Sequence, residues 1–172
     1  MQRPGTDEYE PGFAGYVGLV LETDVMPILR AQADEIRRLA ARLSPERETY
    51  RYAPGKWSVR DILGHIADGE RVFAYRVLCI SRGDQASLPG FDQDDYVATA
   101  GFDSWTAADL AEDFARLRAS TLSLLEHLTP AQWSQAGIAN DNRVTVRALA
   151  FIMAGHTRHH LGVLRDRYSV GI

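Results

Sequence analysis

The sequence predicts an all-α protein folded as a four-helix bundle, and three observations favour this fold class. Four segments carry apolar residues three and four positions apart, which places them on one face of an α-helix. No segment reads as a convincing strand. Two of the four segments begin with the residues of a capping box, a signal for the start of a helix. Four amphipathic helices bury their apolar faces most simply by packing around one core.

Length and composition are those of one globular domain that can bury a core. The chain has 172 residues and a formal net charge of -4, with basic residues scattered among acids, which argues against a nucleic-acid surface. Cys79 is the single cysteine and excludes an intramolecular disulfide. The N-terminus lacks the apolar segment of a signal peptide, and no run approaches the ~18 apolar residues of a membrane helix. We therefore expect a cytoplasmic protein that binds neither nucleic acid nor membrane.

The first 23 residues form an expected irregular arm, because they are rich in glycine and proline. Aromatic side chains such as Tyr9 and Tyr16 could pack this arm against the body of the protein. Residues 24–172 are expected to form the single bundle domain. Its first helix is predicted from about Asp24 to Leu43, with Pro27 in the first turn, where a missing N–H group costs nothing.

The second helix is predicted to begin after Ser58 and to end before Gly83. Ser58 and Asp61 have the spacing of a capping box. His65 lies on the border of the apolar stripe of this helix, and Asp68 lies about one turn away. Cys79, between two apolar residues, is interpreted as packing.

A long connection over residues 83–105 separates the second helix from the third, which is predicted to begin after Thr106, with Asp109 as the capping partner. A connection of this length can run the full height of a bundle, so the two helices can be parallel. Its acidic run Asp92–Asp95 is interpreted as a solvated loop that could also line a substrate mouth. His127, late in the third helix, is interpreted as a favourable charge near a helix C-terminus.

The last helix is predicted from about Val144 to Tyr168, after a connection with turn-forming residues at 140–142. Steps of three and four place His156 and His160 on the core-facing side, followed by Val163 and Arg167. His159 points about 60° away from His156.

Two inward histidines one turn apart can share a divalent ion, which uses neutral imidazole nitrogens as ligands. His65 is the candidate third ligand, and three histidines are typical of a catalytic metal site with an open position. The alternative is that these are core histidines hydrogen-bonded to carbonyl groups. A zincin protease is disfavoured because Thr157 stands where the catalytic glutamate would follow the first histidine. Asp68 is interpreted as a solvated helix residue, with orientation of His65 or direct coordination of the metal ion as the alternatives.

Three stretches together resemble the DinB/YfiT-like superfamily, which is unrelated to the DNA polymerase that shares the DinB name. They are residues 52–70 (YAPGKWSVRDILGHIADGE), 88–94 (LPGFDQD) and 155–160 (GHTRHH). The resemblance covers residues 24–168. It implies a four-helix bundle with up-down-down-up topology, and a nickel or zinc ion held by His65, His156 and His160. It also implies a homodimer.

The resemblance leaves the reaction open. The first hypothesis is a metal-dependent transferase that activates a low-molecular-weight thiol, with His159 or Asp68 as weak candidates for proton transfer. The second is a metal-dependent hydrolase, in which a loop acid such as Asp94 would be the general base. The third is a non-catalytic, metal-stabilised module for binding or stress response.

Overall fold

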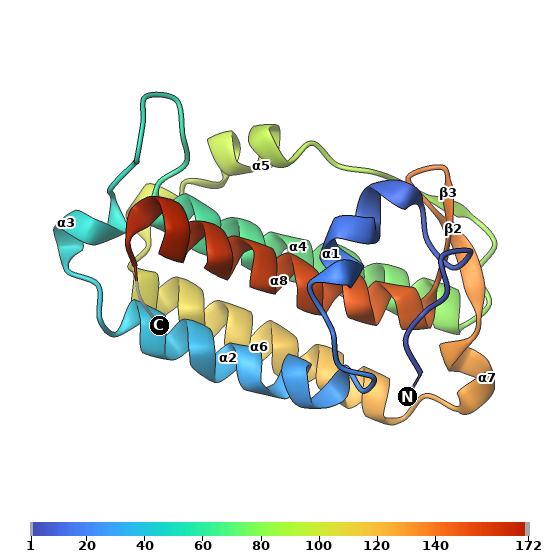
Figure 1. Cartoon of the computed structure of the whole chain (residues 1–172). Coiled ribbons are helices and arrows are strands. Elements are labelled where there is room, and N and C mark those ends of the chain that lie inside the picture. The colour runs from blue at the N-terminus through green and yellow to red at the C-terminus, as the bar shows by residue number, and fades with distance from the viewer. Residues whose placement is uncertain (1, 171–172) are drawn as a thin grey trace.

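The computed structural model describes residues 2–170, and four long helices dominate it (Figure 1). The long helices are α2 (Met26–Ala40), α4 (Val59–Ser81), α6 (Ala107–Glu126) and α8 (Val146–Tyr168). The short helical elements are η1 (Pro11–Phe13), α1 (Ala14–Gly18), α3 (Pro45–Glu48), α5 (Gln93–Ala100), η2 (Phe102–Ser104) and α7 (Pro130–Trp133). The strands are β1 (Ser87–Leu88), β2 (Ala136–Ala139) and β3 (Asn142–Thr145).

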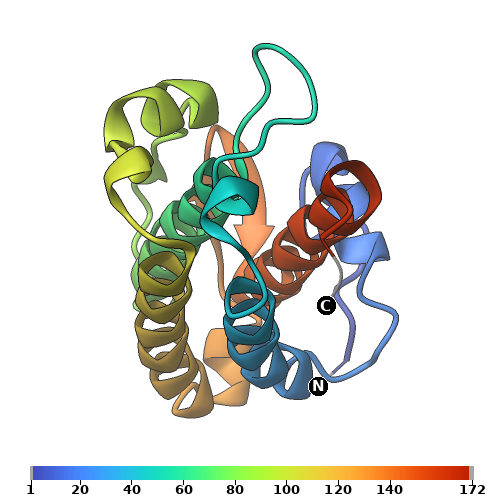
Figure 2. The ribbon, with the colours of Figure 1, turned by 90° about the vertical axis from the view of Figure 1, so that its left-hand side faces the viewer.

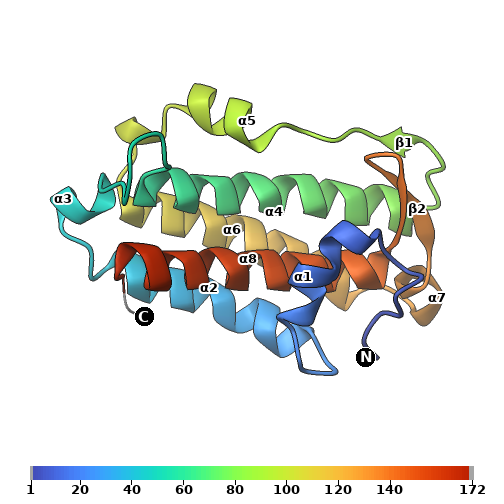
Figure 3. The same cartoon turned by 45° about the horizontal axis from the view of Figure 1, so that its top comes forward.

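The four long helices pack side by side around a common core, which agrees with the predicted bundle (Figure 2). In Figure 3, α4 and α6 run in one direction, whereas α2 and α8 run in the other. The chain passes from α4 to α6 through β1, α5 and η2, which extend along the outside of the bundle. None of the helices among residues 2–170 is long and apolar enough to cross a membrane.

Both predicted capping boxes are confirmed. The Ser58 hydroxyl accepts a hydrogen bond from the Asp61 backbone N–H at 3.1 Å, and the Asp61 carboxylate accepts one from the Ser58 N–H at 2.8 Å. Thr106 and Asp109 form the same reciprocal pair at the start of α6. Each box satisfies N–H groups that have no partner inside the helix, and so fixes where α4 and α6 begin.

The small sheet corrects the expectation that the chain has no strands. β2 and β3 pair antiparallel, and β1 pairs with β2 in parallel. Asn140 and Asp141 form the hairpin turn with φ of 52° and 60°, the left-handed conformation that a two-residue hairpin requires. The sequence predicted this turn but not its strands. Their two to four residues are too short to display an alternating pattern.

The acidic run is exposed to solvent, as interpreted, but it is not a loop. The Asp92 carboxylate accepts hydrogen bonds from the backbone N–H groups of Asp94 and Asp95 and so caps α5. These N–H donors belong to the first turn of the helix, where no backbone acceptor is available to them. The run is therefore the start of a helix that lies along the outside of α4 (Figure 2).

The N-terminal segment, predicted to be irregular, contains η1 and α1 and packs along α8 (Figure 1). Val17 and Val20 are buried in the core, and the Glu8 carboxylate pairs with Arg147 at 2.6 Å. The backbone of Tyr16 lies directly against Gly155, where a Cβ atom would overlap the Tyr16 carbonyl group. The glycine is thus needed for close approach of two backbones.

Replacing Gly155 with Ala is expected to lower the free energy of unfolding by about 1–3 kcal/mol, because the added methyl group forces the N-terminal segment away from α8. Gly162→Ala is the matched control in the same helix. A Cβ atom there meets nothing closer than Arg165 Nη2 at 3.8 Å, so this change should stabilise the protein by about 0.5–1 kcal/mol. Urea denaturation measures both. Equal effects of the two variants would contradict the close approach.

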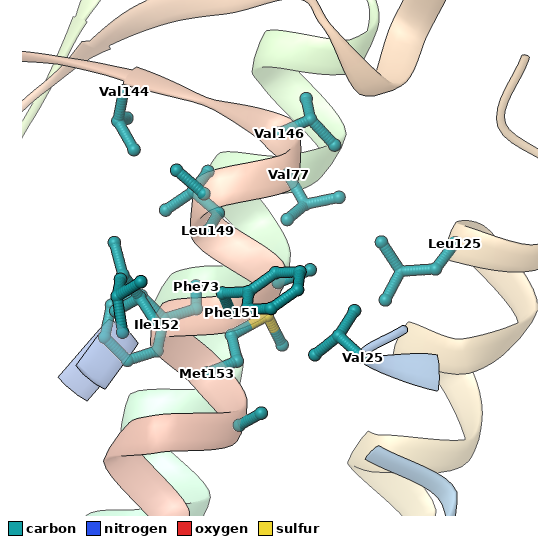
Figure 4. Packing of buried hydrophobic residues seen from close by; sticks show 14 of the residues in the cluster. Val25, Phe73, Val77, Leu125, Val144, Val146, Leu149, Phe151, Ile152 and Met153 are labelled. Carbon is teal, nitrogen blue, oxygen red and sulfur yellow. The ribbon is translucent and has the colours of Figure 1, made fainter. Parts of the chain in front are cut away.

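The apolar core falls into two clusters along the bundle. One lies toward the hairpin, where Leu149 and Met153 of α8 lie near Val77 and Phe73 of α4 (Figure 4). The other lies toward the opposite end of the bundle and includes Leu63, Phe114 and Leu164. Between the clusters, each long helix contributes buried polar side chains instead of apolar ones. They are Gln32, His65, Glu70, Arg118, Thr121, His156, Thr157 and His160.

The buried face of α8 departs from the prediction near its C-terminus. Arg167 is exposed and Val163 is only half-buried, whereas Leu161, Leu164 and Tyr168 are buried. The buried positions Leu164 and Tyr168 follow His160 in steps of four, and each such step turns about 40° beyond a full helical turn. Two consecutive steps of four rotate the face away from positions 163 and 167.

Candidate metal centre

Three histidines predicted as ligands lie together in the buried polar middle of the bundle. His65 projects from α4, and His156 and His160 project from α8. One ring nitrogen from each lies within 4.8 Å of the others, and the Nε2 atoms of His65 and His156 are 3.0 Å apart. The exposed fraction of each residue is 8% or less. The periodicity of two separate helices thus identified side chains that meet in space.

The donor set fits a divalent cation. The Nε2 atom of His160 is buried and has no hydrogen-bond partner among residues 2–170. A buried imidazole nitrogen without a partner costs about 1–3 kcal/mol, and coordination to a metal ion would satisfy it. Convergent neutral imidazole nitrogens are the ligands that nickel and zinc accept. This histidine cluster can therefore hold a metal ion.

Neighbouring residues fix the rings in place. The Trp57 ring, just before α4, lies 4.8 Å from the His65 ring and stacks on His160 at 6.4 Å between centroids. Tyr16, from the N-terminal segment, meets the His156 ring edge-on at 5.5 Å. Gly69 leaves room for that ring, because a Cβ atom there would lie 2.8 Å from His156 Cε1. Sequence reasoning missed these three contributions, since each depends on packing between segments distant in the chain.

Burial lowers the pKa of all three imidazoles, and the neighbouring histidines lower it further. The pKa of His65 falls to about 4 and that of His160 to about 2. The pKa of His156 falls well below its ordinary value for the same reasons. All three rings are thus neutral at pH 7, which is the form that binds a metal ion.

The free energy of unfolding of the metal-free protein should fall as the pH is lowered from 7 to 5. The three buried imidazoles stay neutral in the folded state, whereas in the unfolded chain they take up protons below their ordinary pKa of 6.5. The unfolded state then binds more protons, so stability is complete above pH 6.5 and is lost as the pH falls toward 4. Urea denaturation at several pH values measures this slope.

The exposed His127 provides the control for this slope. It lies at the end of α6, where its Nδ1 atom is 2.7 Å from the Ser123 carbonyl oxygen. His65→Phe should make the pH dependence shallower than His127→Gln does. A flat profile in the unmodified protein would contradict the burial of neutral imidazoles.

His159, Asp68 and Cys79 lie outside the group of three convergent histidines. His159 is exposed, and its ring lies 5.4 Å from Tyr16 and 4.9 Å from His160. The Asp68 carboxylate accepts a hydrogen bond from Arg71 at 3.2 Å, and no hydrogen bond among residues 2–170 joins it to His65. Burial raises the pKa of Asp68. Cys79 is half-buried against the core, which agrees with its interpretation as a packing residue.

A pocket of about 630 Å³ reaches the histidine cluster from the α5 side of the bundle. His160 lies in its wall with His159, Lys56 and Asp94. Tyr52, Trp57 and Tyr168 supply aromatic surface. The pocket is large enough for a small molecule and has acidic, basic and imidazole groups beside the candidate ligand.

Next to the histidines, a buried network of charged and polar groups joins all four long helices. The Arg118 guanidinium of α6 forms two hydrogen bonds to the Glu70 carboxylate of α4, at 2.8 and 2.9 Å. It also donates to Gln32 Oε1 of α2 at 2.8 Å and to Thr157 Oγ1 of α8 at 3.4 Å. Glu70 follows Gly69, and Thr157 follows His156, so the network fixes the helix segments that carry the site.

One protein family and two solved structures are similar to this chain. A family model described as the DinB superfamily matches residues 28–164. A search of curated proteins finds no match. Among solved structures, the chain is similar to YfiT from Bacillus subtilis, described as a probable metal-dependent hydrolase with an unusual four-helix bundle topology. The identity is 15%, the TM-score is 0.77, and 95% of each chain is covered.

A second solved structure is the mycothiol-dependent maleylpyruvate isomerase. It shares 11% identity and a TM-score of 0.65, over 85% of this chain and 61% of that one. Both identities are low, so these two likenesses establish the fold alone. The family model spans most of the sequence and includes all three histidines of the cluster. The resemblance seen in the sequence is therefore confirmed, and this chain belongs to the DinB superfamily.

Proposed function

We propose that this chain is a divalent-metal-dependent enzyme acting on a small molecule, with His65, His156 and His160 as ligands to nickel or zinc. One observation carries the proposal. A buried His160 nitrogen without a hydrogen-bond partner belongs to a cluster of three imidazoles, and the same residue lines a pocket of about 630 Å³. Three protein ligands leave a coordination position for substrate, as in catalytic sites.

A divalent ion held there would lower the pKa of a thiol or of a water molecule in its open position. The chain's own residues prepare the site. Burial holds the three imidazoles neutral, and Trp57 covers His65 and His160 with an apolar ring. Lys56, Asp94 and His159 bring charge and proton-accepting groups to the adjoining pocket.

The preferred activity is transfer of a low-molecular-weight thiol to an electrophilic small molecule. The solved structure of a mycothiol-dependent isomerase with a similar fold supports a thiol as co-substrate. His159 borders the pocket beside His160 and is exposed, so its imidazole is placed to accept the thiol proton. The thiolate would then form a carbon–sulfur bond to the electrophile, and the group that it displaces would leave with the electrons of its broken bond.

A hydrolase is the second candidate, and Asp94 favours it. This carboxylate lies in the wall of the pocket that His160 lines, where it could accept a proton from an attacking water. Asp94→Asn should then abolish the activity. In a thiol transferase, the same replacement should leave most of the activity, whereas His159→Gln should reduce it.

The test is a rate measurement on protein reconstituted with nickel or zinc. Thiols of low molecular weight are combined with chlorodinitrobenzene, and the hydrolysis of activated esters is measured in parallel. We expect a thiol-dependent rate that disappears in the metal-free protein and in His156→Ala. A metal-dependent ester rate without a thiol rate would favour the hydrolase. A protein that binds metal but catalyses neither reaction would favour a non-catalytic binding or stress-response module.

Two further features belong to this proposal. A cytoplasmic location would supply the thiol, and localisation of a fluorescent fusion checks it. A homodimer, implied by family membership, is checked by light scattering across a range of concentrations. A monomer at all concentrations would contradict the homodimer but not the proposed metal site.

A further inference from the structure

A second pocket reaches the histidine cluster beside the N-terminal segment. It has a volume of about 190 Å³ and is lined by His65 and His156, by Tyr16 of the N-terminal segment, and by Arg76. Gln93 lines both this pocket and the larger one. The smaller pocket adjoins the cluster at His65 and His156, whereas the larger pocket adjoins it at His160.

Arg76 is a buried cation without an anionic partner. The exposed fraction of the residue is 5%, and it forms no ion pair among residues 2–170. One N–H of the guanidinium, at Nη2, donates to the Pro89 carbonyl oxygen at 2.8 Å. Its Nε atom is buried with no hydrogen-bond partner. A buried guanidinium stays charged, so leaving it without an anion and with an unused donor is costly.

The chemistry of the pocket matches a carboxylate. No aspartate or glutamate is among the residues that line it, and Gln93, Asn140 and Tyr16 supply neutral hydrogen-bonding groups. Guanidinium groups bind carboxylates through parallel N–H donors, and these are among the stronger hydrogen bonds in proteins. The volume of the pocket suits a small group more than a whole co-substrate.

Arg76 and His65 lie along one face of α4. His65, Gly69, Phe73 and Arg76 are spaced by four, four and three residues, so they follow one another on successive turns. The Phe73 ring lies 5.6 Å from the His156 ring, and the Arg76 guanidinium carbon lies 5.9 Å from the Phe73 ring. One small molecule can therefore contact both the histidine cluster and Arg76.

We propose that this second pocket is a carboxylate subsite, in which Arg76 binds the carboxylate of a small organic acid whose other end reaches the metal ion. The substrate class is thus a carboxylic acid that also carries a metal-binding group. This inference rests on the proposed metal-dependent function. Arg76 acts by binding and orienting the acid.

The test compares matched probes on cobalt-loaded protein, using the visible absorption of cobalt–thiolate bonds as the measure of binding. The probes are 3-mercaptopropionate and its longer homologues, each against the mercapto alcohol of the same length. We expect one acid to bind about ten- to a hundredfold more tightly than its alcohol, the value of a charge-assisted hydrogen bond. Arg76→Gln should remove this preference, and Arg76→Lys should restore part of it.

Arg71→Gln is the matched control, because it removes the same charge from the same helix at an exposed position that pairs with Asp68 and Asp113. It should leave the preference unchanged. Equal binding of acid and alcohol by the unmodified protein, at every length, would overturn the inference. So would an acid preference that survives in Arg76→Gln.

The failure of the proposed function gives a different result. If no thiol produces a cobalt–thiolate band, the thiol activity is wrong, and the subsite is then tested with dicarboxylates on zinc-loaded protein by calorimetry. Binding of a dicarboxylate that depends on Arg76 and not on Arg71 would support the subsite. Absence of such binding would overturn it. If Arg76→Gln fails to fold, Arg76→Lys and the unmodified protein still decide the outcome.

Discussion

His156→Ala should lower the affinity for nickel or zinc by at least about a hundredfold, whereas His159→Ala should retain most of it. His156 is buried and its Nε2 atom lies 3.0 Å from that of His65, but His159 is exposed beside the cluster. Loss of a direct ligand exceeds the 10–100-fold effect typical of residues that merely support one. Calorimetric titration of the metal-free proteins measures both affinities.

Metal binding should also raise the free energy of unfolding. An ion that binds the folded state alone raises the free energy of unfolding by about 4 kcal/mol when its concentration is 1,000 times its Kd. We expect this gain in the unmodified protein and in His159→Ala. At the same ion concentration, the gain in His156→Ala should be about 1.4 kcal/mol or less, because a hundredfold weaker site is then at no more than about ten times its Kd. Far-UV circular dichroism establishes that each variant is folded without metal. If His159→Ala loses as much affinity as His156→Ala, the ligand set is wrong.

Arg118→Met should lower the free energy of unfolding by about 3–5 kcal/mol. The exposed fraction of the Arg118 side chain is 0% and that of Glu70 is 2%, and the two form a bidentate ion pair. Removing the guanidinium leaves a buried carboxylate without its cation, which is the costly outcome for a buried pair. It also deprives Gln32 Oε1 and the Leu29 carbonyl oxygen of a donor. Urea denaturation followed by circular dichroism measures the loss.

Two further variants separate charge from packing. Arg116→Met, two residues away and exposed, should change the stability by less than about 0.5 kcal/mol. The double variant Arg118→Met, Glu70→Met should be more stable than Arg118→Met alone, because it removes the unpaired charge as well. A double variant that is no more stable would show that packing, and not the carboxylate, causes the loss.

Sequence alone predicted the features that depend on local order. The capping boxes at Ser58 and Thr106 are four-residue patterns, and their hydrogen bonds form within one helical turn. The inward direction of His156 and His160 follows from helical periodicity. The meeting of His65 with these two depends on how α4 packs on α8. It was anticipated from the place of His65 on the border of an apolar stripe, together with the family resemblance.

The buried ion pair between Arg118 and Glu70 was not predicted, although the spacing of both residues indicates buried positions. Arg118 lies four residues after Phe114 and three before Thr121, so it continues the buried face of α6. Glu70 stands in the gap that separates Ile66 from Phe73 on α4. Charged residues on an apolar stripe are ordinarily assigned to its edge, since burial without a partner is costly. Only the folded structure shows that these two are partners.

The docking of the N-terminal segment on the last helix has a consequence for the order of folding. Glu8 and Arg147 are 139 residues apart in the chain, and His65 and His156 are 91 apart. Contacts between such distant residues form slowly, because a long loop of chain must close before they are made. During synthesis, α8 leaves the ribosome after the N-terminal segment and α4, so neither the histidine cluster nor the contact between Tyr16 and α8 can form until α8 has been made. We expect the metal site to be among the last parts of the bundle to form.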